Sequence, residues 1–362
     1  MKQKKIAIIS PSAGNGGAEK ASTLLSLMLE NLNYEVHFIA AYTLKDFKVG
    51  GQFYCLQVPK ATRFSFVYQF FGFIKLRRHI KRHNFDAIID FRSRRRFLTE
   101  LVFTYFVVPR LDIMIYTFHL PLMDKYIPKP WFLFRSIYNK AEKIVCVSKG
   151  IKQKTEEIGL ENTQVILNPI DFKFIEDKID SEKLFDFEYI IGVGRMDDNI
   201  KQFDHLMEAY SNSVLPEKHI HLVILGKGQY QSVLEDFQKT LPNGDKIHFA
   251  GFQDNPYKYM HQAKFFVLSS KFEGFPLVVL EALACGTPVI SYDCPTGPSE
   301  IIEHEKNGLL IPAQNKRKLT EGMNAFVENE IRYNQCKANA KKSIAHLTME
   351  DIGKQWQTLL EN

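Results

Sequence analysis

The chain has few cysteines and no pattern among them. Its five cysteines are scattered, odd in number and form no Cys-x-x-Cys pair or metal-ligand cluster: Cys55, Cys146, Cys285, Cys294 and Cys336. This distribution excludes a disulfide framework and predicts reduced thiols in a cytoplasmic protein.

Long apolar runs are also missing. No uncharged stretch reaches the roughly 20 residues that a membrane-spanning helix needs. The opening segment MKQKKIAIIS contains an apolar run too short for a signal sequence, and it indicates a first β-strand. We therefore expect a soluble or peripheral protein that acts in the cytoplasm, on the inner face of the cytoplasmic membrane.

Several signatures of other protein classes are absent as well. There is no internal repeat of solenoid size, no low-complexity tract and no recognisable RNA- or DNA-binding module. The glycine-rich segment GNGGAE after the first apolar run is not a G-x-G-x-x-G sequence, so it does not support a dinucleotide fingerprint.

The length and composition describe a folded protein with more than one core. With 362 residues the chain exceeds what a single core usually serves, and two domains are expected. Its 45% hydrophobic and 24% charged residues are typical of globular domains and exclude disorder.

Short apolar runs alternate with helical segments in both halves of the chain. KKIAIIS, YEVHFIAAY, FDAIIDF, DIMIYTFH and KIVCVS are the strand signals of the first half; FEYIIGVGR, HIHLVILGKG, KIHFAGF, AKFFVLSS and TPVISYD are those of the second. Such runs predict parallel sheets covered on both faces by helices. Around Asn168-Pro169 the alternation stops, and a charged stretch follows.

The fold class predicted is therefore α/β, with two Rossmann-like, doubly wound domains facing across a deep cleft. The first covers residues 1–168 and the second residues 169–345. A C-terminal amphipathic helix at about 346–362 is expected to pack back on the first domain. In such sheets, ligands bind outside the carboxyl ends of the strands.

One apolar helix contains a carboxylate. In EGFPLVVLEALACG, Pro276 suits a first helical position and Gly286 suits the position after the helix end, which predicts a helix from about 276 to 285. Glu281 is its only charged residue. An unpaired buried carboxylate would cost several kcal/mol, so Glu281 faces a solvent edge, pairs with a buried arginine or binds the hydroxyl groups of a ligand.

Neighbouring segments favour the ligand. Gly274 precedes the free N–H groups of a helix start, which suit an anion, and Arg195 and Lys201 follow a strand. Each cation alone is more often a surface charge. Gly226 and Gly228, at another strand end, indicate little beyond a tight turn.

Glu273 and Glu281 match the E-x7-E motif of retaining glycosyltransferases of family 4, which have the GT-B fold. The sequence EGFPLVVLEALACGTPVIS resembles the most characteristic stretch of that family, and GNGGAE, YTFHLP, NPID and GVGRMDDNIK fall in the family's order. The resemblance covers nearly the whole chain. GFQDNPYKYM and DCPTGPSEII resemble bacterial enzymes that extend lipid-linked oligosaccharides or lipopolysaccharide.

The resemblance implies a role for each residue of the motif. Glu281 would bind the ribose hydroxyls of a nucleotide-sugar donor, expected to be UDP-linked, and Glu273 would contact the transferred sugar. Arg195 and Lys201 would neutralise the diphosphate in place of a metal ion, because no Asp-x-Asp motif stands in a metal-site context; no metal and no cofactor are expected. The donor site would be lined by Gly274, Phe275, Pro276 and Leu277.

Four further residues belong to the expected donor site. His119 ends a strand and would hydrogen-bond the sugar, although a lone histidine there is more often structural. Gly16 and Gly17 would allow close approach of a phosphate or sugar, or would simply form a tight turn. Phe252 would read the pyrimidine edge through its backbone, or would pack in the core.

Basic residues are concentrated in one region of a chain whose net charge is only +6. If segment 66–85 is helical, its aromatics gather at one end and its cations at the other, which suits an anionic membrane surface; a solvated helix with its aromatics in the core fits equally. The residues expected to bind membrane or the pyrophosphate of a lipid-linked acceptor are Lys75, Arg77, Arg78, Lys81, Arg82, Arg92, Arg94 and Arg95; Arg96 follows in the same run.

The function expected from the resemblance is transfer of a hexose or N-acetylhexosamine from a UDP-sugar to a lipid-linked or lipopolysaccharide glycan, with retention at the anomeric carbon. Two alternatives remain from the residues. An epimerase or phosphorylase could use the same scaffold, because fold does not fix reaction. A nucleic-acid-binding protein would use the basic segment but would leave Glu273 and Glu281 unexplained.

Overall fold

A computed structural model describes residues 3–14, 16–58, 65–180 and 182–361, with the backbone alone at 65–68. The chain divides into two compact units. Unit 1 contains Met1–Pro169 together with Met349–Asn362, and unit 2 contains Ile170–Thr348. This division lies one residue beyond the expected boundary of the first domain, and it assigns the C-terminal helix to unit 1.

Unit 1 is built on a seven-stranded sheet in the order β3-β2-β1-β4-β5-β6-β7. Every neighbouring pair of these strands is parallel. The strands are β1 (Lys5–Ser10), β2 (Glu35–Ala40), β3 (Gln52–Cys55), β4 (Ala87–Asp90), β5 (Met114–Phe118), β6 (Lys143–Cys146) and β7 (Thr163–Val165). The order reverses between β1 and β4, which is the switch point of a Rossmann-like sheet.

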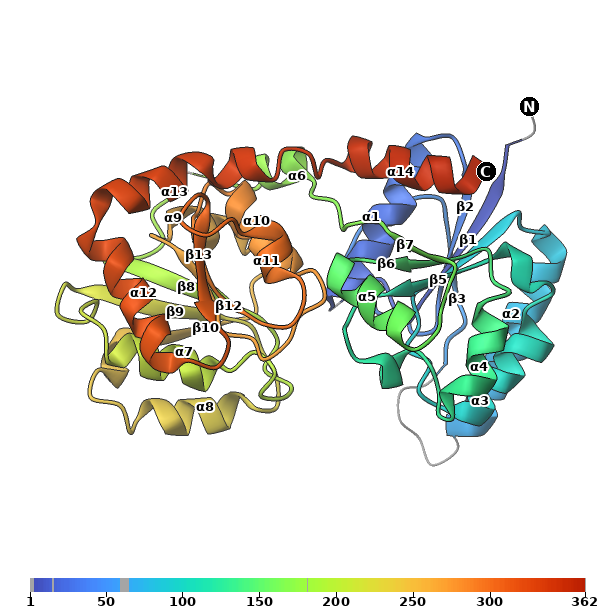
Figure 1. Ribbon diagram of the computed structural model, residues 1–362, viewed down its shortest axis with the longest axis horizontal. Coiled ribbons are helices and arrows are strands. Elements are labelled where there is room, and N and C mark those ends of the chain that lie inside the picture. Colours follow the sequence, from blue (N-terminus) through green and yellow to red (C-terminus); the bar gives the residue numbers. More distant parts are fainter. Residues whose placement is uncertain (1–2, 15, 59–64, 181, 362) are drawn as a thin grey trace. The chain divides into compact units, whose positions relative to one another are not determined.

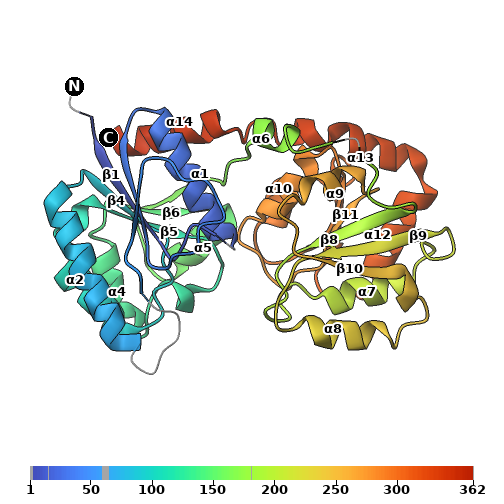
Figure 2. The same cartoon turned by 180° about the vertical axis from the view of Figure 1, so that it is seen from behind.

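Helices cover both faces of this sheet (Figures 1 and 2). On one face, α1 (Gly17–Asn31) reaches β1, where the Ser22 hydroxyl donates to Ser10 Oγ at 3.1 Å. On the other face, the Tyr116 ring of β5 contacts Tyr138 of α4. The helices after β3 are α2 (Ser65–His83), α3 (Phe97–Val102), the π-helix η1 (Phe103–Val107), the 3-10 turns η2 (Leu111–Ile113) and η3 (Met123–Lys125), α4 (Trp131–Tyr138) and α5 (Lys149–Glu157).

The C-terminal helix α14 (Met349–Glu361) packs beside α1 (Figure 1). Its apolar side chains are buried, Trp356 among them. Gly353 lies against Met28 of α1, so that a side-chain carbon there would be 3.8 Å from Met28 Cβ. The Lys4 ammonium also donates to the carbonyl of Leu360 at 2.6 Å. The last segment of the chain is therefore part of the core of unit 1.

Unit 2 repeats the plan with six parallel strands in the order β10-β9-β8-β11-β12-β13. This is the strand order 3-2-1-4-5-6 of a Rossmann-type sheet, with its switch point between β8 and β11. The strands are β8 (Glu188–Val193), β9 (Ile220–Leu225), β10 (Ile247–Gly251), β11 (Phe266–Leu268), β12 (Val289–Asp293) and β13 (Gly308–Pro312).

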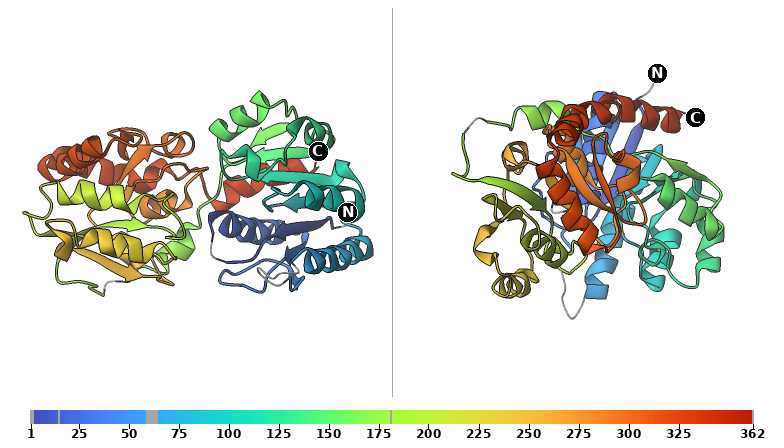
Figure 3. Two further views of the ribbon diagram at one scale, coloured as in Figure 1. Left: turned by 90° about the horizontal axis from the view of Figure 1, so that it is seen from below. Right: turned by 60° about the vertical axis from the view of Figure 1, so that its left-hand side comes forward.

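Helices lie on both sides of this sheet too (Figure 3). Under one face, α7 (Phe203–Ser211), α8 (Gln231–Gln238) and α12 (Lys316–Glu328) contribute Leu206, Leu234 and Met323 to one apolar core. The remaining helices are α6 (Phe172–Glu176), α9 (Tyr257–Gln262), α10 (Leu277–Ala284), α11 (Pro298–Ile301) and α13 (Glu330–Ser343), with the 3-10 turn η4 (Gly244–Lys246). Among the described residues, no helix is both long and apolar enough to cross a bilayer.

Candidate active site

The loops at the carboxyl edge of the unit 2 sheet carry most of the expected donor-site residues. Because all six strands are parallel, the loops that follow β8, β9, β10, β11 and β12 emerge at the same edge. The loops after β8 and β11 flank the switch point, where a doubly wound sheet leaves a crevice for ligands. This edge therefore holds Arg195, Lys201, Phe252 and Glu273.

Lys201 and Glu273 meet at the switch point. The Lys201 ammonium donates to Glu273 Oε1 at 2.6 Å, and the Ser270 hydroxyl donates to the same oxygen at 2.6 Å. Both charged side chains are largely buried. Two residues 72 positions apart in the sequence are thus in direct contact, as expected if both belong to one site.

Further hydrogen bonds hold the two loops in place. The Ser269 hydroxyl donates to the Lys201 carbonyl at 2.8 Å, and the Lys271 amide donates to the Ile200 carbonyl at 2.8 Å. The Thr296 hydroxyl, from the loop after β12, donates to the Glu273 carbonyl. The Glu273 carboxylate is therefore positioned by its loop as well as by its cation.

Glycines bring the loop after β9 against the loop after β8. Gly226 has φ +141°, and a side-chain carbon there would lie 1.8 Å from the carbonyl oxygen of Gly194. At Gly228 a side-chain carbon would lie 2.1 Å from the carbonyl carbon of Met196. Only glycine fits such a close approach of two backbones, so these glycines do more than form a turn.

The segment before α10 is buried and rigidly placed. Gly274, Phe275, Pro276 and Leu277 are all buried. Gly297, with φ +95°, packs so closely that a side-chain carbon would lie 2.7 Å from the Gly274 carbonyl oxygen. Pro276 has φ −71° and ψ 103°, so it caps the helix instead of starting it. The expected helix start at Pro276 is corrected by one residue, to Leu277.

Glu281 lies in the middle of α10 and is 7% exposed. The solvent-edge interpretation of this carboxylate is therefore wrong. The helix ends as expected, with Gly286 in the left-handed region at φ +79°. The buried acid follows Glu273 by eight residues in the sequence and lies on the helix into which the switch-point loop leads.

Two other donor-site candidates are accessible to solvent. The Arg195 side chain is 68% exposed, and its guanidinium lies 3.6 Å from Asp197, a surface ion pair worth little. Phe252 is 48% exposed, which corrects the interpretation of this residue as a core phenylalanine. The Lys227 ammonium lies 4.4 Å from the centroid of the Phe252 ring.

His119 lies at the end of β5 in unit 1 and is buried. Its ring stacks on Phe91 with the centroids 4.9 Å apart, and its backbone amide donates to the Tyr126 hydroxyl at 3.0 Å. The ring nitrogen Nε2 has no hydrogen-bond partner among the described residues. Burial, assisted by the nearby Arg94 cation, lowers the pKa of His119 to about 3. The imidazole is therefore neutral at physiological pH.

Gly16 and Gly17 begin α1 without unusual backbone geometry. Gly16 is the extended residue before the helix, with φ −153°. A side-chain carbon at Gly17 would meet nothing within 4 Å. A side-chain carbon at Gly16 would lie 2.1 Å from Glu19 Oε2, so a larger residue there would require the flexible Glu19 side chain to move. Neither glycine has the left-handed backbone that only glycine adopts easily.

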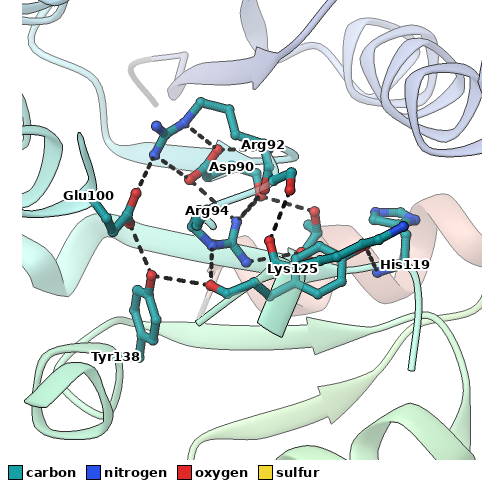
Figure 4. A network of polar contacts seen from close by, with 10 residues as sticks. Asp90, Arg92, Arg94, Glu100, His119, Lys125 and Tyr138 are labelled. Atoms are coloured by element: carbon teal, nitrogen blue, oxygen red, sulfur yellow. Dashed lines mark hydrogen bonds and ion pairs between the residues drawn. The ribbon is translucent and has the colours of Figure 1, made fainter. Parts of the chain in front are cut away.

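Arg92 and Arg94 belong to a buried network of charges (Figure 4). Arg92 donates twice to Asp90, at 3.0 and 2.9 Å, and also reaches Glu100 at 3.4 Å. The Tyr138 hydroxyl donates to Glu100 at 3.0 Å. Burial raises the pKa of Glu100, and the Arg92 charge opposes that effect.

The role predicted for Arg94 is wrong. Its side chain is fully buried and lies 3.4 Å from Asp90. The guanidinium also donates to the carbonyls of Tyr126, Thr117 and Arg92 at 3.1, 3.3 and 3.0 Å. These contacts use its donors inside the protein, so it cannot serve as a surface ligand for a pyrophosphate. Arg92 is similarly occupied, whereas Arg95 and Arg96 are exposed.

The basic segment is a helix, α2, with exposed cations and exposed aromatics. Arg78, Lys81 and Arg82 are exposed, as is Lys75. Arg77 differs, because its guanidinium donates to the Phe106 carbonyl and lies over the Phe106 ring. Phe70 and Phe71 are exposed, which corrects the placement of these aromatics in the core. The side chains of 66–68 lie outside the described residues.

Two successive Rossmann-type units, with a carboxylate and a lysine paired at the switch point of the second, define an α/β enzyme of the GT-B class. The sequence matches the model "Glycosyltransferase Family 4" over residues 15–174 and the model "Glycosyl transferases group 1" over residues 174–343. The chain belongs to this family of glycosyltransferases.

Relatives and solved structures agree with this assignment. The chain is 28% identical over 356 residues to N-acetylgalactosamine-N,N'-diacetylbacillosaminyl-diphospho-undecaprenol 4-alpha-N-acetylgalactosaminyltransferase of Campylobacter jejuni, covering 93% of this chain and 94% of that one. It is 31% identical over 204 residues to lipopolysaccharide 1,6-galactosyltransferase of Escherichia coli, covering 53% and 55%.

Its fold is similar to that of a glycosyltransferase from Rickettsia africae, with a TM-score of 0.80 and 17% identity over 100% of this chain and 98% of that one. It is also similar to Anabaena HepE crystallised with UDP and glucose, with a TM-score of 0.79 and 17% identity over 99% and 100%. The GT-B fold expected from the sequence is confirmed.

Replacing Arg94 by methionine should strongly destabilise unit 1. The network holds two arginines and two carboxylates, so the Arg94→Met change leaves an uncompensated negative charge and several carbonyls without donors. Removing one member of a buried ion pair typically costs about 3–5 kcal/mol. Both tryptophans, Trp131 and Trp356, lie in unit 1, so urea unfolding followed by tryptophan fluorescence measures this unit.

The matched control for Arg94 is Arg95→Met, which removes the same charge from an exposed position. It should change the free energy of unfolding by no more than about 0.5 kcal/mol. Equal stabilities of the two variants would contradict the structural role of Arg94.

His119 should make unit 1 less stable in acid. The pKa of His119 is about 3 in the folded chain and has an ordinary value near 6.5 in the unfolded chain. At a pH between these two values, the unfolded chain binds a proton at this residue and the folded chain does not. The free energy of unfolding therefore falls as the pH drops below about 6.5, by up to about 1.4 kcal/mol per pH unit.

The variant His119→Asn should show a correspondingly shallower slope between pH 6 and 4.5, measured by urea unfolding with tryptophan fluorescence. An unchanged slope in His119→Asn would show that this histidine titrates normally.

Proposed function

We propose that this glycosyltransferase moves a hexose or N-acetylhexosamine from a UDP-sugar to a lipid-linked or lipopolysaccharide glycan, with retention at the anomeric carbon and without a metal ion. The observation that carries the donor half of this proposal is the contact of Lys201 and Glu273 at the switch point of unit 2. The acceptor half is supported by the basic and apolar surface of unit 1 and by the names of the relatives.

The Lys201 ammonium can serve both a carboxylate and a phosphate. It has three N–H donors, and only one of them is used within the described part of the chain, for Glu273. Two donors are left for a diphosphate. The arrangement lets a cation contact the leaving group while it keeps the sugar-binding carboxylate in place.

Glu273 is suited to hold the transferred sugar. Its Oε1 accepts from Lys201 and Ser270, and Oε2 receives no donor from the described residues. A sugar hydroxyl could donate to this second oxygen. Charge-assisted hydrogen bonds of this kind are stronger than neutral ones. In unit 1, we assign His119 to a sugar hydroxyl, because its neutral Nε2 is buried without a partner among the described residues.

Glu281 is assigned to the ribose. Its place in a buried helix next to the switch-point loop suits bidentate acceptance from two neighbouring hydroxyls. Phe252, exposed beside this edge, is assigned to the nucleotide base.

Fixed cations would stabilise the departing diphosphate. The leaving group gains negative charge as the sugar–phosphate bond breaks, so Lys201 and Arg195 interact more strongly with the transition state than with the ground state. Arg195 is exposed and held only by a long contact to Asp197, which leaves its guanidinium able to reorient toward a phosphate. These two residues would take the role that a divalent ion has in other glycosyltransferases.

Unit 1 is the part of the chain that we assign to the acceptor and to the membrane. η1 contacts both α2 and α3. The large apolar side chains exposed on these three elements and on α4 are Phe70, Phe71, Leu98, Tyr105, Phe132 and Leu133. Exposed cations on α2 and at Arg95 and Arg96 accompany them. Apolar side chains combined with cations suit an anionic bilayer surface.

The names of the relatives favour the same acceptor class. The Campylobacter jejuni relative acts on a diphospho-undecaprenol glycan, and the Escherichia coli relative on lipopolysaccharide, by name. Both acceptors join a glycan to a lipid, so an enzyme that extends either one works at a membrane surface.

Changing the two glutamates should separate sugar transfer from nucleotide binding. Glu273→Gln should lower turnover at least a hundred-fold with little loss of UDP affinity, because it contacts the sugar. Glu281→Gln should weaken UDP binding about ten-fold or more, because one charge-assisted hydrogen bond is worth roughly 1.5–3 kcal/mol. Radiolabelled UDP-sugars with butanol extraction of the lipid product measure turnover, and calorimetry measures UDP affinity.

Glu217→Gln is the control for this pair, since it removes an exposed acid that precedes β9, at the amino edge of the unit 2 sheet and away from the proposed donor site. The assay is run with and without EDTA, which should not change the initial rate. Wild-type rates in both Glu273→Gln and Glu281→Gln would refute the assignment. Release of a free epimer without any lipid product would favour the epimerase alternative.

Reversing three exposed charges on α2 should abolish binding to anionic vesicles. Arg78→Glu, Lys81→Glu and Arg82→Glu remove three cations that each contribute about 1 kcal/mol near such a surface, which amounts to a loss of roughly a hundred-fold or more in affinity. Flotation with vesicles that contain phosphatidylglycerol measures the bound fraction.

The matched control places the same charge change on unit 2, through Lys218→Glu, Lys337→Glu and Lys342→Glu, all exposed. It should float like the wild-type protein. If the wild type fails to float, or if both triple variants lose binding equally, α2 is not the membrane-binding element.

A further inference from the structure

Three histidines of unit 1 lie close together where α2 packs against β2. His37 lies in β2, and His79 and His83 lie one turn apart in α2. One ring nitrogen from each of the three lies within 4.8 Å of the others. The donor-site residues do not include any of them, and the mechanism proposed above does not use them.

The distances suit ligands of one metal ion. His37 Nδ1 lies 3.2 Å from His79 Nε2. In a tetrahedral zinc site with Zn–N bonds of 2.0–2.1 Å, two ligand nitrogens are about 3.3 Å apart. The ring of His83 lies 4.4 Å from each of the other two, centroid to centroid. A small side-chain rotation of His83 would bring its nitrogen to the same distance.

The surroundings hold the rings in place. His37 is fully buried in β2, which lies next to the edge strand β3. Tyr54 stacks on His79 with the centroids 4.3 Å apart, and Phe85 contacts the His37 ring at 5.0 Å. Such packing limits rotation of the ligands before a metal arrives, which lowers the entropy cost of binding.

A carboxylate, Glu35, lies beside the three histidines. Glu35 Oε1 lies 3.2 Å from His37 Nε2, where it can orient the ring as a second-shell acceptor. The Lys5 ammonium pairs with Glu35 at 3.1 Å, and Arg82 lies on the same helix as His79 and His83.

We propose that His37, His79 and His83 form a site for one Zn²⁺ or similar borderline divalent transition-metal ion, which fastens the last turns of α2 to β2. Imidazole ligands at helix positions i and i+4 with a third on a neighbouring strand are suited to such ions, and not to Mg²⁺ or Ca²⁺, which prefer oxygen.

The place of the site in the fold indicates a structural role. α2 leads directly into β4, so its last turn lies at the edge of the sheet where strands begin. Ligands of doubly wound sheets bind at the opposite, carboxyl edge. The ion would instead fix the helix that carries Arg78, Lys81 and Arg82. This inference does not depend on the donor chemistry proposed above, and a structural ion at this site is compatible with sugar transfer that uses no metal ion.

The test is a titration of untagged, chelator-treated full-length protein with Co²⁺. One equivalent should bind and produce the visible absorption of a four- or five-coordinate nitrogen site. Zn²⁺ should displace it, and one equivalent of Zn²⁺ should raise the melting temperature by mass action. Absence of stoichiometric binding at micromolar Co²⁺ would overturn the proposal.

Two sets of variants locate the ion. His79→Gln and His83→Gln, alone, should each lower Co²⁺ affinity at least ten-fold, and together they should abolish the absorption. In unit 2, His221 Nδ1 lies 2.8 Å from His248 Nε2, and among the described residues this pair is not part of a group of three possible metal ligands. His221→Gln is therefore the matched control and should leave the spectrum unchanged. A spectrum lost in His221→Gln but kept in the double variant would place the ion elsewhere.

A folding defect is distinguished by the circular dichroism spectrum and by UDP affinity, which should stay the same in His79→Gln/His83→Gln. A double variant that keeps its fold and still binds Co²⁺ with wild-type affinity would also overturn the proposal.

Discussion

The ion pair of Lys201 and Glu273 joins the two loops at which the strand order of unit 2 reverses. Either charge alone would be costly in this largely buried place. Together, with the Ser270 hydroxyl, they are compensated, and neither uses all of its hydrogen-bonding capacity within the described residues. In the proposed function, the same two groups that join the loops would also contact the sugar and the diphosphate.

Unit 1 also contains buried charges that compensate one another, but most of their hydrogen-bonding groups are used within the protein. At the end of β4 and in the segment that follows, the chain buries Asp90, Arg94 and Glu100 and partly buries Arg92, and the charges balance one another (Figure 4). The donors of Arg94 are directed to backbone carbonyls of three segments, so the arginine organises loops instead of binding ligands. Charged residues near strand ends thus serve structure in unit 1 and are available for chemistry in unit 2.

Much of the fold could be predicted because its central strands are buried on both faces and appear as continuous apolar runs. Three strands were missed: β3, β7 and β13. All three are edge strands of their sheets, and β3 and β7 are only partly buried. β3 and β7 have one neighbour and only partial burial, so they have no continuous apolar run and their sequences resemble loops. β13 has the sequence GLLIP, an apolar run of only four residues that ends in a proline. For the site, the E-x7-E motif indicated Glu273, and the structure added its contact with Lys201.

Local sequence by itself determined which segments are buried, where α10 begins and ends to within one residue, and which acidic pair marks the family. The tertiary structure alone decided which charges face one another. Arg94 and Arg95 are neighbours of the same type, yet one is enclosed by carbonyls and a carboxylate and the other is exposed. His37 is separated from His79 by 42 positions, and only the pairing of β2 with its covering helix brings their nitrogens together. Periodicity reports whether a residue is buried, whereas its electrostatic partner lies in another segment whose position the fold sets.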